Sequence, residues 1–441
     1  MREMKDSGIE WIDEIPLDWT AKPLKWMVKF GKGLPITKDN LIEQGIPVVS
    51  YGQIHSKTND GTHLRDDLIR FVSEAYLESN PLSLGKKGDI FFADTSEDYA
   101  GIGNAVLVDI DTPVFAGYHT VIVRPDDQSY SRYLAYLFLT DAWRSQLCSE
   151  ASGIKVFSIT QGLLKKTTVI LPPAEKAVAM TDYLDRKCSQ IDAIIARQQE
   201  VIEKLKAYKL SVITEAVTKG LNPDVPMKNS GIEWIGEIPE HWEIIKTRHI
   251  VKDIGDIDHY MPESVAAGIP YLMTGDLKDF VSEVDFDSCK QVAIDNYLKL
   301  SKKVKIEKGD LIFARYATIG TVCLVDVDKD FLVSYSCVIV KVDPNLIESK
   351  FLMYYYKSTA FLEEILKFSN ANTQSNIGKD SMHKAKICTP PIKEQKEIIR
   401  YLEKKCSSIE SLLKSKQAVI DKLTAYKKSL IYEVVTGKKE V

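Results

Sequence analysis

The 441-residue chain contains no apolar run near the roughly 20 residues that a membrane-spanning helix needs. Its first residues are charged and lack the apolar core of a secretory signal. Its seven cysteines are odd in number and form no Cys-x-x-Cys pair, so neither a disulfide framework nor a zinc cluster is indicated. We therefore expect a cytoplasmic protein with reduced thiols and no membrane partner.

An excess of positive charge is also missing. Lys and Arg total 58 against 62 Asp and Glu, which gives a formal charge of −4. This balance excludes the binding of polyanions through bulk charge, so any nucleic-acid face must be local or shared with a partner. Hydrophobic residues make up 44% and charged residues 27%, as in an ordinary folded protein.

Familiar catalytic signatures are absent as well. There is no G-x-x-x-x-G-K-[ST] phosphate loop, no G-x-S-x-G nucleophile elbow and no pair of histidines at metal-ligand spacing. Gly101 and Gly103 precede an expected strand instead of opening a helix, so they do not indicate a dinucleotide loop. The Pro-Pro pairs at 172–173 and 390–391 lack the polar and aromatic neighbours of an amino-methyltransferase loop. These absences favour a binding protein over an enzyme.

What the sequence does contain is a tandem repeat. The segment Ser7–Trp19 returns as Ser230–Trp242 at an offset of 223 residues. By Pro172, whose counterpart is Pro390, the offset has fallen to 218 residues, and it stays constant from there to the end of the repeat. Length differences therefore concentrate in the preceding part of each copy, which is where surface loops carry specificity.

Each constant part predicts a long helix, because apolar residues alternate at spacings of four and three for more than four heptads. The Pro-Pro pairs mark the starts, and Gly220 and Gly437 mark the ends. The expected seam residues are Leu184, Ile191, Ile195, Ile202 and Leu205 in the first helix and Leu402, Ile409, Leu413, Ile420 and Leu423 in the second.

Polar residues interrupt both seams at matching positions, first at Gln198 and Lys416 and again at Lys209 and Lys427. Such interruptions fix register and partner choice in coiled coils. Because the seams coincide in length and in these interruptions, we expect the two helices to pair as an antiparallel coiled coil. The alternative is two separate helices on separate cores.

The part before each helix predicts an α/β (α+β) domain with a mixed, largely antiparallel sheet. The expected strands lie at 46–51, 89–93, 105–108 and 120–123, and again at 310–314, 322–325 and 337–340; helices are expected at 130–147 and 347–366. The expected division is two globular domains at 1–171 and 221–389, with the helices at 172–220 and 390–441, related by an internal pseudo-twofold repeat.

The duplicated Ser-Gly-Ile-Glu-Trp-Ile motif, together with Pro-Pro-led heptad helices that end in Ala-Tyr-Lys-x-Ser, closely resembles the specificity subunit of type I restriction-modification systems. The resemblance covers the whole chain. It implies that residues 1–171 and 221–389 are target-recognition domains, each reading one half of a split, asymmetric site in double-stranded DNA. It also implies that the helices at 172–220 and 390–441 act as a spacer.

The resemblance implies partners too. Two modification subunits would dock on the chain and carry S-adenosylmethionine and adenine methyl transfer, and restriction subunits would use ATP and Mg. This chain is then expected to bind no cofactor and to catalyse no reaction. One departure stands out: the family's Pro-Pro-x-x-Glu-Gln helix start is present at 390–395, whereas 172–177 reads Pro-Pro-Ala-Glu-Lys-Ala. The two starts therefore need not make the same partner contacts.

Base reading needs side chains with paired donors and acceptors, and phosphate contacts need Lys, Arg, Ser or Thr. The loop after the strand at 89–93 differs most from its counterpart, so we favour it in both copies. The candidate DNA-binding residues are His55, Lys57, Asn59, Thr95, Ser96, Tyr118, His119 and Lys155 in the first copy, and Arg315, Tyr316, Tyr335, Asn372, Thr373, Gln374 and Asn376 in the second. Ordinary solvated loops, and for the tyrosines half-buried core positions, are the alternative.

The leading interpretation is a non-catalytic DNA-recognition subunit. A non-enzymatic tandem-repeat scaffold for other proteins is the second, and an enzyme with an unrecognised motif is the third. A split site needs two readers at a fixed separation, because in-phase major-groove faces lie about 34 Å apart or at multiples of that distance. A helix of about 40 residues is roughly 60 Å long and can span such a distance.

Overall fold

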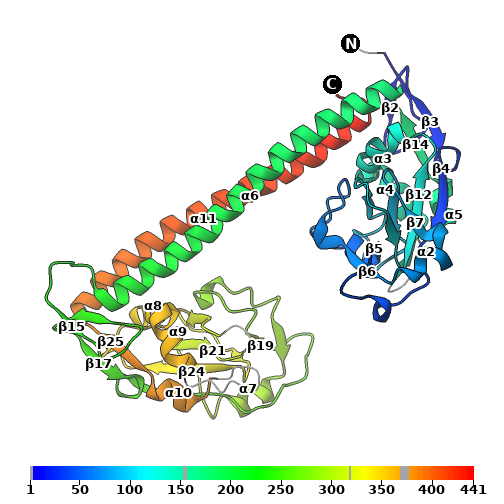
Figure 1. Cartoon of the computed structure of the whole chain (residues 1–441). Coiled ribbons are helices and arrows are strands. Elements are labelled where there is room, and N and C mark those ends of the chain that lie inside the picture. Colours follow the sequence, from blue (N-terminus) through cyan, green and yellow to red (C-terminus); the bar gives the residue numbers. More distant parts are fainter. Residues whose placement is uncertain (1–2, 152–155, 317–318, 368–376) are drawn as a thin grey trace. The chain divides into compact units, whose positions relative to one another are not determined.

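The computed structural model describes residues 3–151, 156–316, 319–367 and 377–441 (Figure 1). The chain divides into two compact units: Met1–Gln198 together with Ala418–Val441, and Gln199–Gln417. Two long helices, α6 (Ala174–Lys219) and α11 (Ile392–Val435), each contribute to both units. Within the described ranges, no helix combines the length and the apolar character needed to cross a membrane.

The first unit is built on two four-stranded sheets. One has the order β10-β8-β12-β4 and is antiparallel throughout; the other has the order β6-β5-β11-β7, in which β5 and β11 are parallel. The strands of these sheets are β4 (Val28–Lys32), β5 (Ile46–Val49), β6 (Arg70–Val72), β7 (Leu84–Gly85), β8 (Ile90–Ala93), β10 (Ala105–Leu107), β11 (Val114–Ala116) and β12 (Thr120–Pro125).

Shorter pairs complete the first unit: β1 (Met4–Asp6) with β2 (Glu14–Pro16), β3 (Thr20–Pro23) with β14 (Thr168–Leu171), and β9 (Thr95–Ser96) with β13 (Phe157–Ser158). Its helices are α1 (Tyr51–Ile54), α2 (Ala75–Ser79), α3 (Ser131–Phe138), α4 (Asp141–Cys148) and α5 (Gln161–Lys166). Its 3₁₀ helices are η1 (Leu24–Trp26), η2 (Lys38–Asn40), η3 (Asp66–Leu68), η4 (Pro81–Ser83) and η5 (Gln128–Tyr130).

The second unit repeats this plan. Its main sheet has the order β18-β24-β21-β22, the counterpart of β4-β12-β8-β10, and its second sheet has the order β20-β19-β23 with β19 and β23 parallel. The strands are β15 (Met227–Asn229), β16 (Glu237–Pro239), β17 (Glu243–Lys246), β18 (Val251–Gly255), β19 (Ile269–Leu272), β20 (Lys290–Val292), β21 (Leu311–Ala314), β22 (Val322–Leu324), β23 (Leu332–Val333), β24 (Cys337–Val342) and β25 (Lys386–Thr389). The helices are η6 (Thr247–His249), η7 (Val281–Glu283), α7 (Ile294–Leu300), α8 (Ser349–Lys357), α9 (Thr359–Leu366) and α10 (Lys379–Lys384). The expected α/β (α+β) class with mixed, largely antiparallel sheets is confirmed.

The helical stretches expected at 130–147 and 347–366 are present, and each is divided into two helices. The break lies at Thr140 in the first copy and at Ser358 in the second, where the backbone is extended. The Thr140 hydroxyl accepts a hydrogen bond from the backbone of Trp143, and the Ser358 hydroxyl accepts one from Phe361. Each hydroxyl caps a free backbone N–H at the start of the next helix, so Thr140 is the N-cap of α4 and Ser358 is the N-cap of α9.

The core lies on both faces of each main sheet. In β8, Phe91 and Phe92 point to opposite faces, as strand geometry requires, and both are fully buried. The Phe92 ring packs against Phe138 and Trp143 of α3 and α4. In the second unit the matching Phe313 packs against the aromatic rings of α8 and α9.

The long helices pair antiparallel in each unit. In the first unit, Leu184 near the start of α6 shares an apolar cluster with Ile431 at the end of α11, and Lys427 Nζ lies 2.7 Å from Asp192. In the second unit, Ile213 near the end of α6 shares a cluster with Leu402 at the start of α11. The expected antiparallel pairing is confirmed.

An ion pair repeats with the helices. Lys209 Nζ lies 2.6 Å from Glu410 Oε1, and these positions are the repeat counterparts of Lys427 and Asp192. The lysines that interrupt the seam therefore meet acidic residues of the opposite helix in both units. Of the ten expected seam residues, those that are buried are Leu184, Ile191, Ile202, Leu402, Ile409 and Ile420, and those that are half-buried are Ile195, Leu205, Leu413 and Leu423.

Each copy of the repeated motif packs against the C-terminal end of the long helix that belongs to the other repeat. The motif at 7–19 contacts the end of α11, and the motif at 230–242 contacts the end of α6. Gly437, just after α11, packs so closely on Pro16 that a Cβ there would lie 2.5 Å from the proline ring. Gly220, just after α6, is packed less tightly, since a Cβ there would lie 3.1 Å from Glu394 Oε1 and 3.2 Å from the Trp242 ring. Both glycines have a positive φ, 72° and 77°, which ends a helix at little steric cost only for glycine.

Candidate functional site

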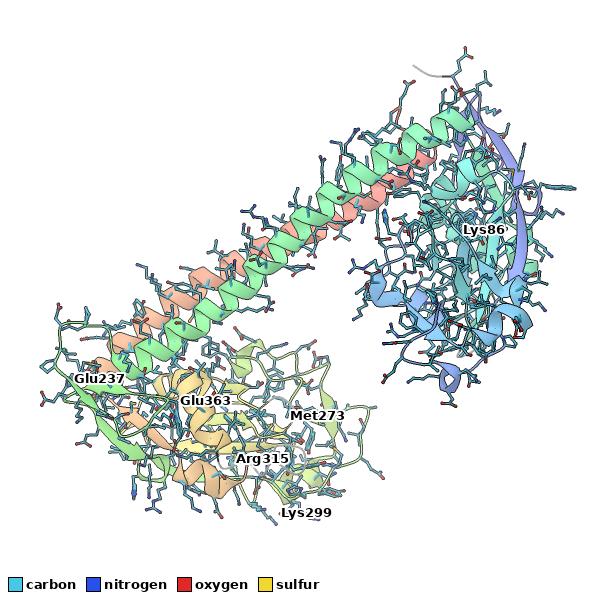
Figure 2. All side chains as sticks on the ribbon, viewed as in Figure 1. Lys86, Glu237, Met273, Lys299, Arg315 and Glu363 are labelled. Carbon is cyan, nitrogen blue, oxygen red and sulfur yellow. The ribbon has the colours of Figure 1, made fainter. Side chains whose placement is uncertain are left out.

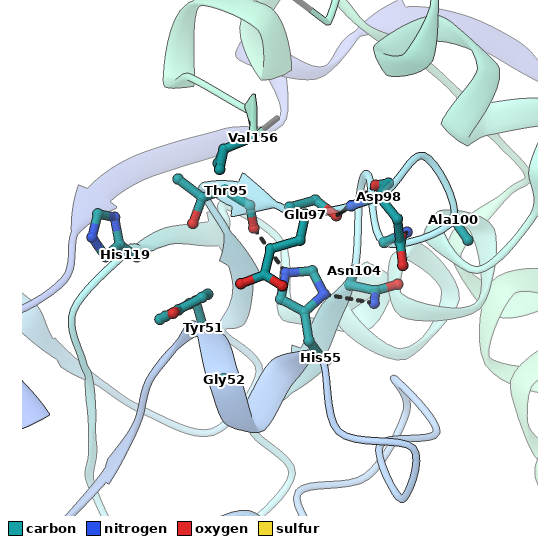
Figure 3. A pocket seen from close by; sticks show the side chains of 12 residues that line it. Tyr51, Gly52, His55, Thr95, Glu97, Asp98, Ala100, Asn104, His119 and Val156 are labelled. Atoms are coloured by element: carbon teal, nitrogen blue, oxygen red, sulfur yellow. Dashed lines mark hydrogen bonds between the residues drawn. The ribbon is translucent and has the colours of Figure 1, made fainter. Parts of the chain in front are cut away.

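A cleft of about 580 Å³ opens in the first unit (Figure 3). Its walls come from α1 and the residue after it, from the loop 95–104, and from His119 and Val156. The topology explains this convergence: β5 and β11 are parallel neighbours, so α1 and residues 117–119 leave the sheet at the same edge. The loop after β8 reaches the same place because Asp94 donates its backbone N–H to the His119 carbonyl at 3.0 Å.

His55 is held inside a chain of hydrogen bonds. Its Nε2 donates to the Thr95 carbonyl at 2.8 Å, and its Nδ1 accepts from the Asn104 amide at 3.1 Å. Asn104 in turn accepts from Arg144 at 2.9 Å. Because a carbonyl can only accept, this arrangement assigns a neutral imidazole with the proton on Nε2. Both ring nitrogens are committed, so His55 positions the loop that carries Thr95.

Aromatic rings form the opposite wall. The Tyr51 ring lies edge-on to His119 at 5.4 Å and to Tyr118 at 5.6 Å between centroids. His119 has a φ of 53°, a left-handed conformation that costs a non-glycine residue roughly 1 kcal/mol. Its Nδ1 donates to Asp94 Oδ1 at 3.1 Å. Backbone and side-chain contacts together hold His119 at the mouth of the cleft.

Four candidates of the first copy meet in this cleft: His55, Thr95, Ser96 and His119. Tyr118 is half-buried behind Tyr51. Asn59 donates to the carbonyls of Ile54 and Ala105 and is a structural residue of its loop; Lys57 is exposed outside the cleft; and Lys155 lies outside the described residues.

Sequence reasoning missed Tyr51, Glu97 and Asn104. Tyr51 had only the signal of ending an expected strand, and Glu97 lay within the loop already favoured for its divergence.

The second unit places Arg315 where the first has Asp94. The Arg315 backbone N–H donates to the Ser336 carbonyl at 3.0 Å, as Asp94 does to His119. The Arg315 carbonyl accepts from Ile377, as the Asp94 carbonyl accepts from Ile159. The two positions are therefore structurally equivalent, and they carry opposite charges.

The Arg315 side chain, labelled in Figure 2, is buried with only 4% of the residue exposed. Its guanidinium donates to the Tyr335 carbonyl at 2.9 and 3.1 Å, lies 3.3 Å from His259 Nε2 and pairs with Asp256 at 2.9 Å. Base reading requires a guanidinium edge that is open to DNA. These partners favour a positioning role for Arg315, and direct base reading by it stays a prediction.

Cations gather around Asp256. Besides Arg315, Lys379 lies 3.1 Å and Lys303 3.7 Å from Asp256 Oδ1. Burial acts to raise the pKa of Asp256, but the hydrogen bond from Lys379 and the nearby positive charges outweigh it and lower the pKa.

Above this cluster the His259 ring stacks on the Tyr335 ring at 4.9 Å. Tyr316 is half-buried with its ring 5.3 Å from the Arg315 guanidinium. The remaining candidates, Asn372, Thr373, Gln374 and Asn376, lie outside the described residues.

At the start of each long helix, the carbonyl of the first proline accepts a hydrogen bond from a side chain, but the side chain differs between the two copies. The Pro172 carbonyl accepts the Tyr130 hydroxyl at 2.9 Å, whereas the Pro390 carbonyl accepts the Gln395 amide at 2.8 Å. Gln395 also accepts the backbone N–H of Glu348 at 2.8 Å. The departure from Pro-Pro-x-x-Glu-Gln in the first copy is therefore compensated within the chain.

A second cleft, of about 1020 Å³, lies within the second unit between the helix pair and the globular part. Lys209, Glu410, Tyr354 and Lys357 are among its lining residues. Across the described residues, no group of three or more His, Cys, Asp or Glu side chains is placed to hold a metal ion. The seven cysteines are free.

The comparisons with known proteins agree on one family. The type I restriction modification DNA specificity domain matches residues 16–204 and again residues 239–421. The EcoKI specificity subunit of Escherichia coli K12 is 18% identical over 96% of this chain and 90% of its own length. The MjaVIII specificity subunit of Methanocaldococcus jannaschii is 25% identical over 67% of each chain.

Among solved structures, a chain from work on complex assembly and conformational transition of the type I R-M system has a TM-score of 0.66 at 16% identity. It covers 96% of this chain and 99% of its own length, so the similarity of fold extends over both units. The resemblance drawn from the sequence is confirmed.

Proposed function

The chain belongs to the type I restriction modification DNA specificity family, and from this premise we propose that its two globular parts read the two halves of a split, asymmetric DNA site. Residues 1–171 would read one half and residues 221–389 the other. The observation that carries the proposal is the charge difference at equivalent positions: Asp94 in the first part and Arg315 in the second occupy the same place in the same scaffold. Two readers that differ at this edge suit two different half-sites.

The helices at 172–220 and 390–441 would set the distance between the half-sites. Support comes from the repeated ion pairs, Asp192 with Lys427 and Lys209 with Glu410, which fix the register of one helix against the other in each unit. The same helices would dock two modification subunits, and the cleft beside Lys209 and Tyr354 offers a surface for such a contact.

In this proposal the chain is not catalytic. S-adenosylmethionine would be bound by the modification subunits, and ATP and Mg by restriction subunits. The net charge of −4 supports this assignment of roles to the partner subunits, because a chain without a basic excess gains little DNA-binding affinity from counterion release. Much of the phosphate neutralisation would then fall to the partner subunits.

Co-expression with a modification subunit, followed by mapping of methyladenines across the host genome, tests the proposal. We expect a motif of two unlike half-sites separated by unspecified bases. The modification subunit without this chain is the control and should give no such motif. A continuous or palindromic motif would contradict the two-reader assignment, and no methylation at all would favour a protein-interaction scaffold.

A further inference from the structure

The cleft of the first unit is unlike a phosphate site. Among the described residues that line it, none is Lys or Arg, whereas Glu97 and Asp98 are both carboxylates. Phosphate contacts in protein–DNA complexes come mainly from cations and N–H or O–H donors. A carboxylate placed against a DNA backbone would be repelled. The cleft is therefore suited to the edge of a base and not to the backbone.

Several polar groups in the cleft already have hydrogen-bond partners. Both nitrogens of His55 and the Thr95 carbonyl belong to the chain of bonds through Asn104. The Ser96 hydroxyl donates to the Asp98 carbonyl at 2.7 Å, and Asp98 Oδ1 accepts the Gly101 N–H at 2.7 Å. These groups shape the cleft, but they have little capacity left for a ligand.

Glu97 is different. Its side chain is exposed and directed into the cleft (Figure 3), and no hydrogen bond or ion pair joins its carboxylate to another described residue. Across the cleft, the Nδ1 of His119 donates to Asp94. The Glu97 carboxylate, which can only accept, therefore faces the cleft beside the ring of Tyr51, and the hydroxyls of Tyr51 and Thr95 can donate or accept.

We propose that Glu97 determines specificity in the first reader by accepting a hydrogen bond from the exocyclic amino group of a base in the major groove. This inference rests on the proposed function. Two bases show such a group there, cytosine at N4 and adenine at N6. Guanine presents O6 and N7, which are acceptors, so a carboxylate would be repelled by that edge. Cytosine fits better than adenine because adenine places the acceptor N7 beside its amino group.

The test uses the full chain in complex with its modification subunits, without S-adenosylmethionine, at one fixed salt concentration. The recognised motif is established first. Duplexes are then made in which one base at a time loses its major-groove amino group: purine replaces adenine, and 2-pyrimidinone replaces cytosine. Every base pair contains adenine or cytosine, so each position of both half-sites can be probed.

For the unaltered complex we expect affinity to fall roughly 10- to 100-fold when the amino group is removed at one position of one half-site. Glu97→Ala should weaken binding to the native duplex and should no longer respond to the loss of that amino group. Glu97→Gln, whose amide oxygen can still accept a hydrogen bond from the amino group, should keep part of the response. Glu43→Ala, which removes an exposed carboxylate elsewhere in the first unit, is the matched control and should behave as the unaltered complex. Retained discrimination at the other half-site shows that each variant is folded.

The outcomes separate clearly. A response to 2-pyrimidinone assigns cytosine, and a response to purine assigns adenine. If no position responds, or if Glu97→Ala weakens binding to native and amino-free duplexes while the ratio between them is unchanged, the inference is overturned although the two-reader function stands. If the complex prefers no sequence at all, the proposed function fails and the inference fails with it.

Discussion

The two globular parts share a scaffold and differ at the edge where their loops meet. At equivalent positions the first holds Asp94, paired with His119, and the second holds Arg315, paired with Asp256. The first edge is a cleft with the carboxylates of Glu97 and Asp98 and no Lys or Arg among its described lining residues. The second is a cluster of cations around one buried carboxylate. The difference shows that the electrostatic character of a loop edge can be inverted while the strands beneath it keep their pairing.

The shared scaffold is clearest at the turn before β8 and β21. Gly88 and Gly309 adopt φ values of 91° and 96°, and the aspartate that follows each one is buried. Asp89 accepts hydrogen bonds from Arg124, whereas Asp310 accepts one from Lys341. The cation changes between the copies, but the buried pair remains. The scaffold therefore has the same arrangement of charge in both copies, a buried aspartate paired with a cation. At the loop edge, by contrast, equivalent positions carry opposite charges.

The largest expected effect tests that shared scaffold. Asp89→Ala leaves the Arg124 guanidinium, only 32% exposed, without its carboxylate, and should destabilise the first unit by about 3 kcal/mol. Asp310→Ala should cost the second unit less, about 2 kcal/mol, because Lys341 keeps its contact with Glu307 at 3.0 Å.

Hydrogen exchange of the full chain, read from peptides of β8 and β21, measures each unit separately. Asp111→Ala is the control, because that carboxylate is 90% exposed and its removal should change stability by no more than about 0.5 kcal/mol. Equal losses for Asp89→Ala and Asp111→Ala would show that the buried pair is not the common support.

A smaller effect tests the divergent edge. Arg315→Ala removes the support of Tyr335 and Asp256, and should weaken recognition of one half-site by about 10- to 30-fold while leaving the other unchanged. Asp94→Ala should affect the opposite half-site only.

Binding of the assembled complex to duplexes altered in one half at a time measures both effects. Arg315→Lys, which keeps the charge but loses the paired contact with the Tyr335 carbonyl, should lie between Arg315→Ala and the unaltered chain. If Arg315→Ala weakened recognition of both half-sites, the conclusion that the two loop edges act on different half-sites would be wrong.

The smallest effect is a pH dependence confined to the first unit. Burial acts to raise the pKa of Asp60, but hydrogen bonds from His63 and Thr62 outweigh it and hold the pKa at about 2. The same bond to Asp60 raises the pKa of His63 above 6.5, against the effect of burial. The stability from Asp60 is present above its unfolded pKa of about 3.9 and is lost as pH falls toward 2. The stability from His63 is present below pH 6.5 and is lost as pH rises through its raised pKa.

We therefore expect the loop at 57–64 to exchange faster as pH is raised from 6 to 9, after correction for intrinsic exchange, by an amount equivalent to about 0.5 kcal/mol. His63→Gln should remove this loss at high pH and keep the stability plateau above pH 4. The corresponding loop at 274–280, which contains no histidine, is the internal control. A similar change in both loops would rule out the Asp60–His63 pair as its cause.

Much of the fold could be predicted because its signals are local. The heptad spacing of Leu184, Ile191 and Ile202 marks one face of a helix whatever surrounds it, and Gly220 marks where that helix stops. Strands such as β8 and β21 were also readable from short apolar runs. The breaks at Thr140 and Ser358 were missed because a hydroxyl residue inside a helical pattern is an N-cap only if the chain turns there.

The candidate site was predictable only in part. His55, Thr95 and His119 were singled out as separate loops, yet nothing in their spacing shows that they share one cleft. That depends on the parallel pairing of β5 with β11, two strands joined by a long connection. Arg315 had the chemistry of a base reader, but its burial depends on Asp256, about 60 residues earlier in the chain.

The sequence by itself determined the duplication, the two long helices and the family, because repeats, periodicity and motifs are properties of neighbouring residues. Only the tertiary structure decided which groups remain free at the loop edges and which helix end each repeated motif supports. Gly437 packs on Pro16, more than 400 residues away, and the Glu97 carboxylate has no hydrogen bond or ion pair with another described residue, whereas the neighbouring Ser96 and Asp98 are both hydrogen-bonded. Such outcomes follow from long-range packing and from hydrogen-bond satisfaction, which depend on all the surrounding groups at once.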